Sequence, residues 1–207
     1  MWNSQVIIML LEGIRDTLYM TLASTLFGYI IGLPMGIVLT VTDKDGIRPN
    51  AAVYKVLDVI SNLLRSIPFI ILLILLIPFT RFVVGRSYGS TATIVPLTIA
   101  AAPYIARMVE SSLKEVDAGV IEAARSMGAS DFQIVTKVML VEARTILGYS
   151  AMAGTVGGGG LGDIAIRYGY TRWQTDIMVV TVVLLVILFQ IFQTIGMKIA
   201  NRLDRRK

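Results

Sequence analysis

Side chains able to do chemistry are scarce in this 207-residue chain. It has no histidine and no cysteine, which excludes disulfides, thiolate nucleophiles, and metal sites or proton relays built on histidine. Its long apolar stretches hold no pair of carboxylates spaced for general acid and base catalysis. We therefore expect no enzyme activity, no catalytic residue, no metal site and no cofactor.

A glycine run resembles a nucleotide-binding loop but does not fit one. Gly157, Gly159 and Gly162 match the spacing G-x-G-x-x-G, yet no strand pattern precedes them and no G-K-[ST] follows. The chain also lacks the phosphate-binding lysine of an ATPase motif. We therefore expect any ATP hydrolysis to be carried out by a partner protein.

The segment 122–128 has residues suited to gripping another protein. Small side chains at Ala123 and Ala124 let a helix backbone approach a partner closely, and Gly128 permits a turn that other residues resist. Glu122 can pair with a basic group on the partner or brace Arg125 in its own loop. The alternative reading is an ordinary interfacial helix–turn–helix.

The elements that carry this segment are predicted to lie in a membrane. The chain is 55% hydrophobic and 16% charged, with a mean hydropathy of +0.73, whereas a soluble domain has about 25% charged residues. A bilayer core needs about 20 apolar residues in a helix. Charge-free blocks of about that length occupy residues 17–42, 66–80, 87–106 and 177–197.

The net charge of +5 follows the positive-inside rule and does not indicate nucleic-acid binding. One set of loops carries 14 of the 19 basic residues and the other set carries 5. The first set is predicted to be cytoplasmic. The N-terminus is then outside and the C-terminus inside, and the number of crossings is odd.

The first span is predicted to run from about residue 18 to 41, after an interfacial helix at 6–11. Gly28, Gly32 and Gly36 are four residues apart, which allows close helix approach in lipid, and Pro34 can kink the helix. The third span, at about 91–106, contains two prolines, which indicates a helix packed inside a bundle. The last span covers 177–197.

The second span is predicted to climb out of an amphipathic stretch at 53–64 and to continue to about residue 80. Arg65 lies at their junction. Because an arginine facing lipid costs about 2.5–3.5 kcal/mol at mid-bilayer, we expect it to snorkel inward or to face the bundle interior. A structural role is favoured over binding of substrate.

Residues 107–144 are too polar to span the membrane and too periodic to be disordered. Two short helices separated by Gly128 are predicted, the second capped by Ser130 or Asp131. Their apolar stripes are Val120, Ile121 and Ala124, then Phe132, Val135, Val138 and Met139. Three acidic residues of this loop, Glu110, Glu115 and Asp117, are predicted to be solvated.

An odd number of crossings requires one more span, between Arg144 and Arg167. The apolar stretch at 145–156 reaches only about 18 Å, against about 30 Å for a bilayer core. Three explanations remain open. The segment is re-entrant, or the span extends into the glycine run at 157–160, or residues near Arg144–Ile146 are missing from the sequence.

The sequence resembles the permease family of ABC importers, whose cytoplasmic signature is E-A-A, three residues, G, nine residues, then I-x-L-P. Glu122, Ala123, Ala124, Gly128 and Leu140 match in type and spacing. Val138 replaces isoleucine, and Val141 stands in place of proline. Three further stretches, 65–69, 96–107 and 148–160, resemble the methionine-uptake branch, in which the fourth helix is longer.

This resemblance implies one multi-pass transmembrane domain over 1–207 in the bacterial inner membrane. The domain is all-α, with about five spans and a cytoplasmic coupling loop at 107–144. The implied partners are cytoplasmic ABC ATPase subunits, a periplasmic or lipid-anchored substrate-binding protein and a second copy of the chain. Tyr149, Ser150 and Met152 are candidates for the pathway of an apolar amino acid; helix packing explains them equally well. An importer for another small solute, or a scaffold or channel without an ATPase, remain the alternatives.

Overall fold

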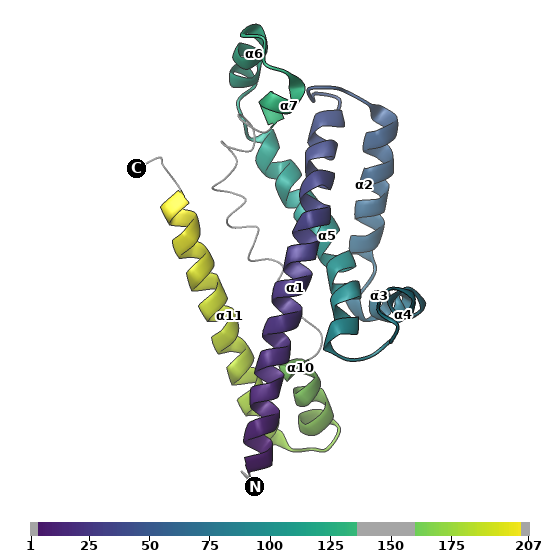
Figure 1. The fold of residues 1–207 in the computed structure, drawn as a ribbon, viewed down its shortest axis with the longest axis vertical. Coiled ribbons are helices and arrows are strands. Elements are labelled where there is room, and N and C mark those ends of the chain that lie inside the picture. Colours follow the sequence, from purple (N-terminus) through teal and green to yellow (C-terminus); the bar gives the residue numbers. More distant parts are fainter. Residues whose placement is uncertain (1–3, 136–159, 204–207) are drawn as a thin grey trace.

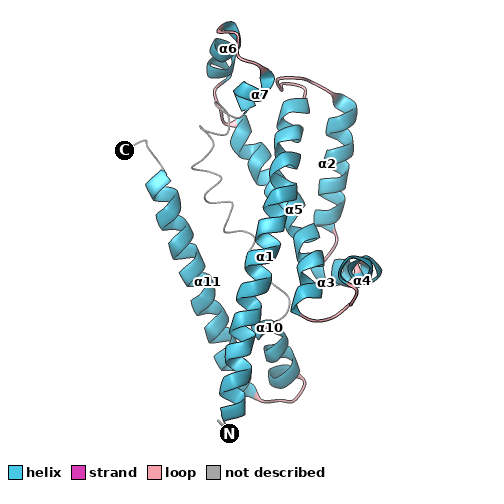
Figure 2. Cartoon of the chain, in the orientation of Figure 1, coloured by secondary structure: helices cyan, strands magenta, loops and turns pink. Residues whose placement is uncertain are grey.

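The computed structural model describes residues 4–135 and 160–203. All regular elements in these ranges are helices (Figure 2), in agreement with the all-α prediction. In chain order they are α1 Ser4–Thr42, α2 Ala51–Ser66, α3 Phe69–Leu75, α4 Ile77–Val84, α5 Ser90–Lys114, α6 Ala118–Ser126, α7 Asp131–Gln133, α10 Leu161–Ile164, the π-helix η3 Ala165–Tyr170 and α11 Thr175–Leu203.

α1 and α5 cross at the centre of the molecule (Figure 1) and pack through the predicted glycines. A Cβ atom added to Gly32 would lie 2.6 Å from the carbonyl oxygen of Ala102, and one added to Gly36 would lie 2.5 Å from that of Ala106. Only glycine permits this approach. The expectation that these glycines bring two helices together is therefore confirmed.

The N-terminal segment and the first span form one helix, not two. α1 has 39 residues and continues through Pro34. At 1.5 Å per residue it is about 58 Å long, well beyond a bilayer core of about 30 Å. Its first turns are held by Leu10, which packs against Leu161, Ile164 and Ile177.

The second span is not the straight continuation that we expected. α2 ends at Ser66, and α3 leaves it at an angle of 107°. Pro68 explains the break, because it has no N–H to donate and forces the preceding Ile67 into an extended conformation, with φ −79° and ψ 124°. A bent pair of helices therefore replaces a single rod.

Three of the described helices are long and apolar enough to cross a membrane: α1, α5 and α11, the last over Thr175–Ile195. The bent pair α2–α3 counts as a fourth if it forms one span. α5 is the most buried of the three, which agrees with the expectation from Pro96 and Pro103. α6, α7 and the end of α11 lie toward one end of the molecule, and α1 begins at the other (Figure 1).

Candidate functional site: a helix–turn–helix at one end of the bundle

α5 extends to Lys114, so residues 107–114 belong to this long helix and not to the loop in which we expected them. The helix–turn–helix begins at Asp117, whose side chain accepts a hydrogen bond from the N–H of Gly119 at 2.8 Å and caps α6. α6 covers nine residues and includes the Glu122–Ala123–Ala124 segment.

Gly128 ends α6 in a left-handed conformation, with φ +83°. The N–H of Gly128 donates to the carbonyl of Arg125 at 3.0 Å, and the N–H of Ala129 donates to that of Ala124 at 3.1 Å. This pair of bonds is the Schellman motif. No atom lies within 4 Å of a Cβ added to Gly128, so backbone conformation, and not space, requires glycine here.

Ser130 caps the second short helix, as predicted. Its hydroxyl accepts from the N–H of Gln133 at 3.3 Å, and the Gln133 amide oxygen accepts from the N–H of Ser130 at 2.9 Å. This reciprocal capping box fixes the direction in which the chain leaves the turn. The turn and both caps thus form from local sequence signals.

Ala124 faces the protein's own core, contrary to the expectation that both alanines meet a partner. It is 5% exposed and packs in one cluster with Ile105, Val109 and Leu113 of α5. Ala123 and Glu122 are exposed. The two alanines therefore have different roles. Ala124 packs α6 against α5, and Ala123 is exposed where a partner protein can contact it.

Two large apolar side chains project from this turn into solvent. Met127 is 82% exposed and Phe132 is 77% exposed. The predicted apolar stripes were partly wrong, since Phe132 and Val120 are exposed while Ile121 and Val135 are at least partly buried. Sequence reasoning did not select Met127 and Phe132 as contact residues, although both lie beside the Gly128 turn. Apolar side chains at an exposed tip are typical of a protein contact.

A second anchor joins α6 to the loop after α1. The Arg125 guanidinium donates from Nη2 to the carbonyl oxygen of Ile47 at 2.8 Å, and it lies 3.8 Å from the Asp131 carboxylate. Arg125 therefore braces the loop through Asp131 and not through Glu122, which we had considered as its partner.

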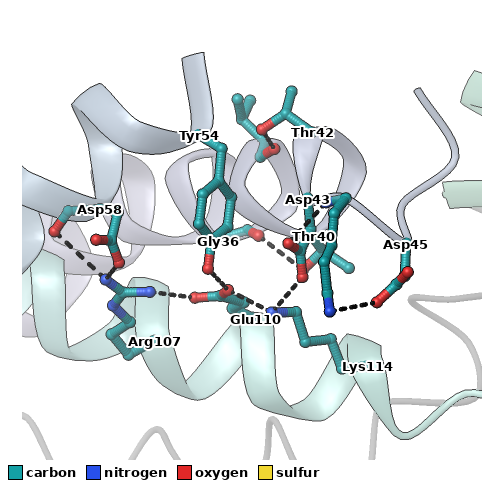
Figure 3. Close-up of polar contacts among 12 residues, drawn as sticks. Gly36, Thr40, Thr42, Asp43, Asp45, Tyr54, Asp58, Arg107, Glu110 and Lys114 are labelled. Atoms are coloured by element: carbon teal, nitrogen blue, oxygen red, sulfur yellow. Dashed lines mark hydrogen bonds and ion pairs between the residues drawn. The ribbon is translucent and has the colours of Figure 1, made fainter. Parts of the chain in front are cut away.

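A network of charges joins α2 and the last turns of α5 to the loop after α1 (Figure 3). The Glu110 carboxylate accepts hydrogen bonds from Arg107 at 2.7 Å, from Lys114 at 2.8 Å and from the Tyr54 hydroxyl at 3.3 Å. Arg107 also pairs with Asp58. Arg107, Glu110 and Lys114 lie on α5, and Tyr54 and Asp58 on α2.

The prediction that Glu110 is solvated is wrong. Its side chain is only 6% exposed. Arg107 and Lys114 of the same helix surround it, together with Tyr54 of α2, which is 56 residues away in sequence. Glu115 and Asp117 are exposed, as predicted. A buried carboxylate between two basic side chains acts as a structural clamp, since breaking such a pair leaves an uncompensated charge.

Lys114 extends the network to the loop after α1. Its ammonium lies 2.7 Å from the Asp43 carboxylate. This hydrogen bond holds the pKa of Asp43 below its usual value of 3.8, so Asp43 is ionised at neutral pH. The geometry of the whole region offers no reacting group among the described residues. It suits the transmission of a force from α6 to three long helices.

Several predicted residues lie outside the described ranges. They are the loop residue Leu140, the pathway candidates Tyr149, Ser150 and Met152, and the short stretch at 145–156 with the segment Arg144–Ile146.

Comparison with protein families gives a match to the family described as "Binding-protein-dependent transport system inner membrane component", over residues 28–207. A probable D-methionine transport system permease protein MetI from Vibrio cholerae is 47% identical over 210 residues, covering 96% of this chain and 93% of that protein. Because 96% of 207 residues is about 199, this chain is about 11 residues shorter than the relative within the aligned stretch.

The D-methionine transport system permease protein MetI of Escherichia coli is 51% identical over 158 residues, covering 70% of this chain and 73% of that protein. Among solved structures, a chain of the MetNI methionine ABC transporter in an inward-facing conformation superposes with a TM-score of 0.95 at 45% identity, covering 99% of this chain and all of that one. An amino acid ABC transporter at 19% identity, with a TM-score of 0.74, shares the fold.

Proposed function

Because the chain belongs to the family of binding-protein-dependent transport system inner membrane components, we propose that it is the permease subunit of an ATP-driven importer of methionine. The observation that carries this proposal is its similarity to D-methionine transport permeases along nearly the whole chain. The permease itself is not an enzyme, and a partner subunit hydrolyses the ATP.

We propose that the whole chain forms one transmembrane domain with five spans. α1, the bent pair α2–α3, α5 and α11 supply four of them. The stretch at 145–156, from which the sequence predicts the remaining span, lies outside the described residues. The N-terminus is then periplasmic and the C-terminus cytoplasmic. Supporting this orientation, α11 ends at the same end of the molecule as α6 (Figure 1), and the loop between α1 and α2 at that end carries Lys44 and Arg48.

The exposed face of α6 is the proposed contact for the ATPase. Glu122, Ala123 and Met127 on α6 and its turn, with Phe132 on α7, face away from the bundle. The apolar Met127 and Phe132 side chains enter a groove on the ATPase, and Glu122 pairs with a basic group there. Gly128 and Leu140 belong to this coupling loop through the family signature.

The coupling is proposed to be mechanical. Closure of two ATPase subunits around ATP moves α6. The packing of Ala124 transmits this motion to α5, and the Arg125–Ile47 hydrogen bond transmits it to the loop that leads into α2. The Glu110 network makes the ends of α1, α2 and α5 move as one body. Two copies of the permease then switch between inward-facing and outward-facing arrangements. Methionine arrives from a substrate-binding protein and passes Tyr149, Ser150 and Met152.

Reconstitution tests this function. The chain, the ATPase that copurifies with it and the corresponding substrate-binding protein are placed in proteoliposomes, and uptake of radiolabelled methionine is followed with and without ATP. We expect ATP-dependent uptake that excess unlabelled methionine suppresses and unrelated amino acids leave unchanged. A variant lacking residues 122–128 should insert normally and lose uptake.

Each part of the proposal has its own contrary outcome. ATP-dependent uptake of a different solute, with methionine inert, would exclude methionine and retain the importer. Persistent absence of a nucleotide-binding subunit after gentle purification would exclude the importer itself. Undiminished uptake after deletion of 122–128 would exclude α6 as the coupling element.

A further inference from the structure

Arg65, in the last turn of α2, has a guanidinium that no described residue neutralises. Its side chain is exposed, and it forms no hydrogen bond or ion pair with the part of the chain that the structure describes. Arg107 on the neighbouring helix differs, since Asp58 and Glu110 neutralise it. Arg107 contacts Asp58 and Asn62 on α2, and Arg65 lies on the same face of that helix, one turn after Asn62.

The depth of Arg65 makes its free charge costly. Arg65 is 14 residues from the start of α2 at Ala51, which is about 21 Å along the helix axis. Ala101, which lines the same pocket as Arg65, lies 3.3 Å from a Cβ atom added to Gly28, and Gly28 is likewise about 21 Å from the end of α1 at Thr42. Arg65 therefore lies well inside the bundle on a helix of the candidate α2–α3 span, and a cation within a membrane span marks a functional site by default.

A pocket of about 430 Å³ opens beside Arg65, between the α2–α3 break and α5. Leu72 and Leu97 form part of its apolar wall, and Arg65 and Tyr104 bring polar groups to it. This volume is in the range of sites for small molecules. An apolar wall with one cation fits a ligand that carries a carboxylate and an unbranched apolar side chain.

The backbone beside the pocket points to the same use. α2 and α3 meet at 107° around Ile67 and Pro68, both of which line the pocket. Irregular backbone at membrane depth occurs where it is buried in protein or lines a cavity. Discontinuous helices also form the substrate sites of other transporters.

We propose that this pocket is a transient binding site for the transported amino acid, with the α-carboxylate on Arg65 and the side chain against Leu72 and Leu97. The proposal rests on the proposed function. It assigns a substrate contact to Arg65, for which the sequence favoured a structural role. A charge-assisted hydrogen bond fixes the carboxylate. The apolar wall makes only dispersion contacts with the thioether, which permits release.

Photolabelling tests the site. The permease–ATPase complex in lipid nanodiscs is illuminated with a diazirine analogue of methionine, and labelled peptides are mapped by mass spectrometry. We expect label in peptides containing residues 65–72 or 97–105, displaced by methionine and not by methioninol, which lacks the carboxylate. R65Q should lower this labelling by about tenfold or more, the loss expected for a hydrogen bond to a charged group.

Matched variants separate binding from folding. R65K keeps the charge and should retain most of the label, and R81Q, which removes an exposed arginine on α4, should label like the wild type. Equal displacement by methioninol, or unchanged labelling of R65Q, overturns the proposal. Loss of copurified anionic lipid from R65Q, with labelling unchanged, also overturns it by assigning Arg65 to a lipid phosphate. ATP-dependent methionine uptake without label in the pocket refutes this site and leaves the importer intact.

Discussion

The guanidinium of Arg125 donates a hydrogen bond from Nη2 to the main-chain carbonyl oxygen of Ile47 at 2.8 Å. The two residues are 78 positions apart in sequence, and their contact ties α6 to the loop between α1 and α2. A force on α6 therefore reaches α1 and α2 as well as α5. This arrangement makes the helix–turn–helix part of the bundle instead of a loosely attached loop.

The Arg125–Ile47 bond is predicted to affect coupling more than folding. Because both groups are partly solvated, R125A should cost little stability, about 1 kcal/mol. It should lower the methionine transported per ATP hydrolysed by about threefold or more, since α6 then moves partly free of α1. The ratio of uptake to ATPase activity in proteoliposomes measures this effect.

S126A is the matched control, because the Ser126 hydroxyl donates to the Glu122 carbonyl within α6 and to no other group in the described part of the chain. It should leave the ratio unchanged. A parallel fall of uptake and ATPase activity in R125A, with the ratio preserved, would show that the bond serves assembly and not coupling.

Glu110 is predicted to stabilise the end of the bundle. E110A leaves Arg107 and Lys114 without their shared carboxylate and should lower the free energy of unfolding by about 2 kcal/mol, less than for a fully buried pair because Lys114 is 40% exposed. E110Q keeps an acceptor for Tyr54 and should lose less. Thermal unfolding in detergent measures both.

E115Q provides the comparison, since Glu115 is exposed on the same segment and should have no effect. If E110A unfolds at the same temperature as E115Q, the buried network contributes nothing to stability.

Gly128 is predicted to be required for its backbone conformation alone. G128A places a Cβ at φ +83° and should cost about 1 kcal/mol, with a matching loss of uptake, whereas G128N should cost less because asparagine tolerates this region. G162A is the control, because a Cβ there also meets no atom within 4 Å and its φ is not in the left-handed region. Equal losses in G128A and G162A would contradict the conformational explanation.

The Asp43–Lys114 pair predicts a pH dependence. The pKa of folded Asp43 is below 3.8, so the pair stabilises the protein fully above that value and its contribution disappears as the pH falls through the lowered pKa. D43N should therefore reduce the melting temperature at pH 7, by the equivalent of about 1 kcal/mol or less because solvent screens the pair. The difference between D43N and wild type should shrink as the pH falls below 3.8 and vanish below the lowered pKa. A difference that does not shrink in acid would assign Asp43 another role.

Local signals in the sequence predicted the parts of this fold that depend on neighbouring residues. Gly128 and Ser130 indicated the turn and its cap, and Gly32 and Gly36 indicated the close helix pair. Pro68 carried the signal for the α2–α3 break, but the uninterrupted apolar composition of residues 66–80 outweighed it in the sequence interpretation.

Contacts between distant segments could not be predicted from the sequence. Glu110 reads as a solvated residue in a polar loop, because nothing near it indicates that Tyr54 will cover it. Ala123 and Ala124 are identical in type and adjacent, and only the packing of α6 on α5 makes one exposed and the other buried. The exposure of Met127 follows from the same packing.

The central claim, that the exposed face of α6 meets the ATPase, is tested most directly by site-specific photocrosslinking in the assembled complex. A photoreactive amino acid at position 123 or 127 should crosslink to the ATPase subunit, and one at the exposed Tyr88 on the loop before α5 should not. ATP binding should change the yield at 123 and 127 if α6 carries the motion. Absence of crosslinks at both α6 positions, or equal yields at position 88, would contradict the claim.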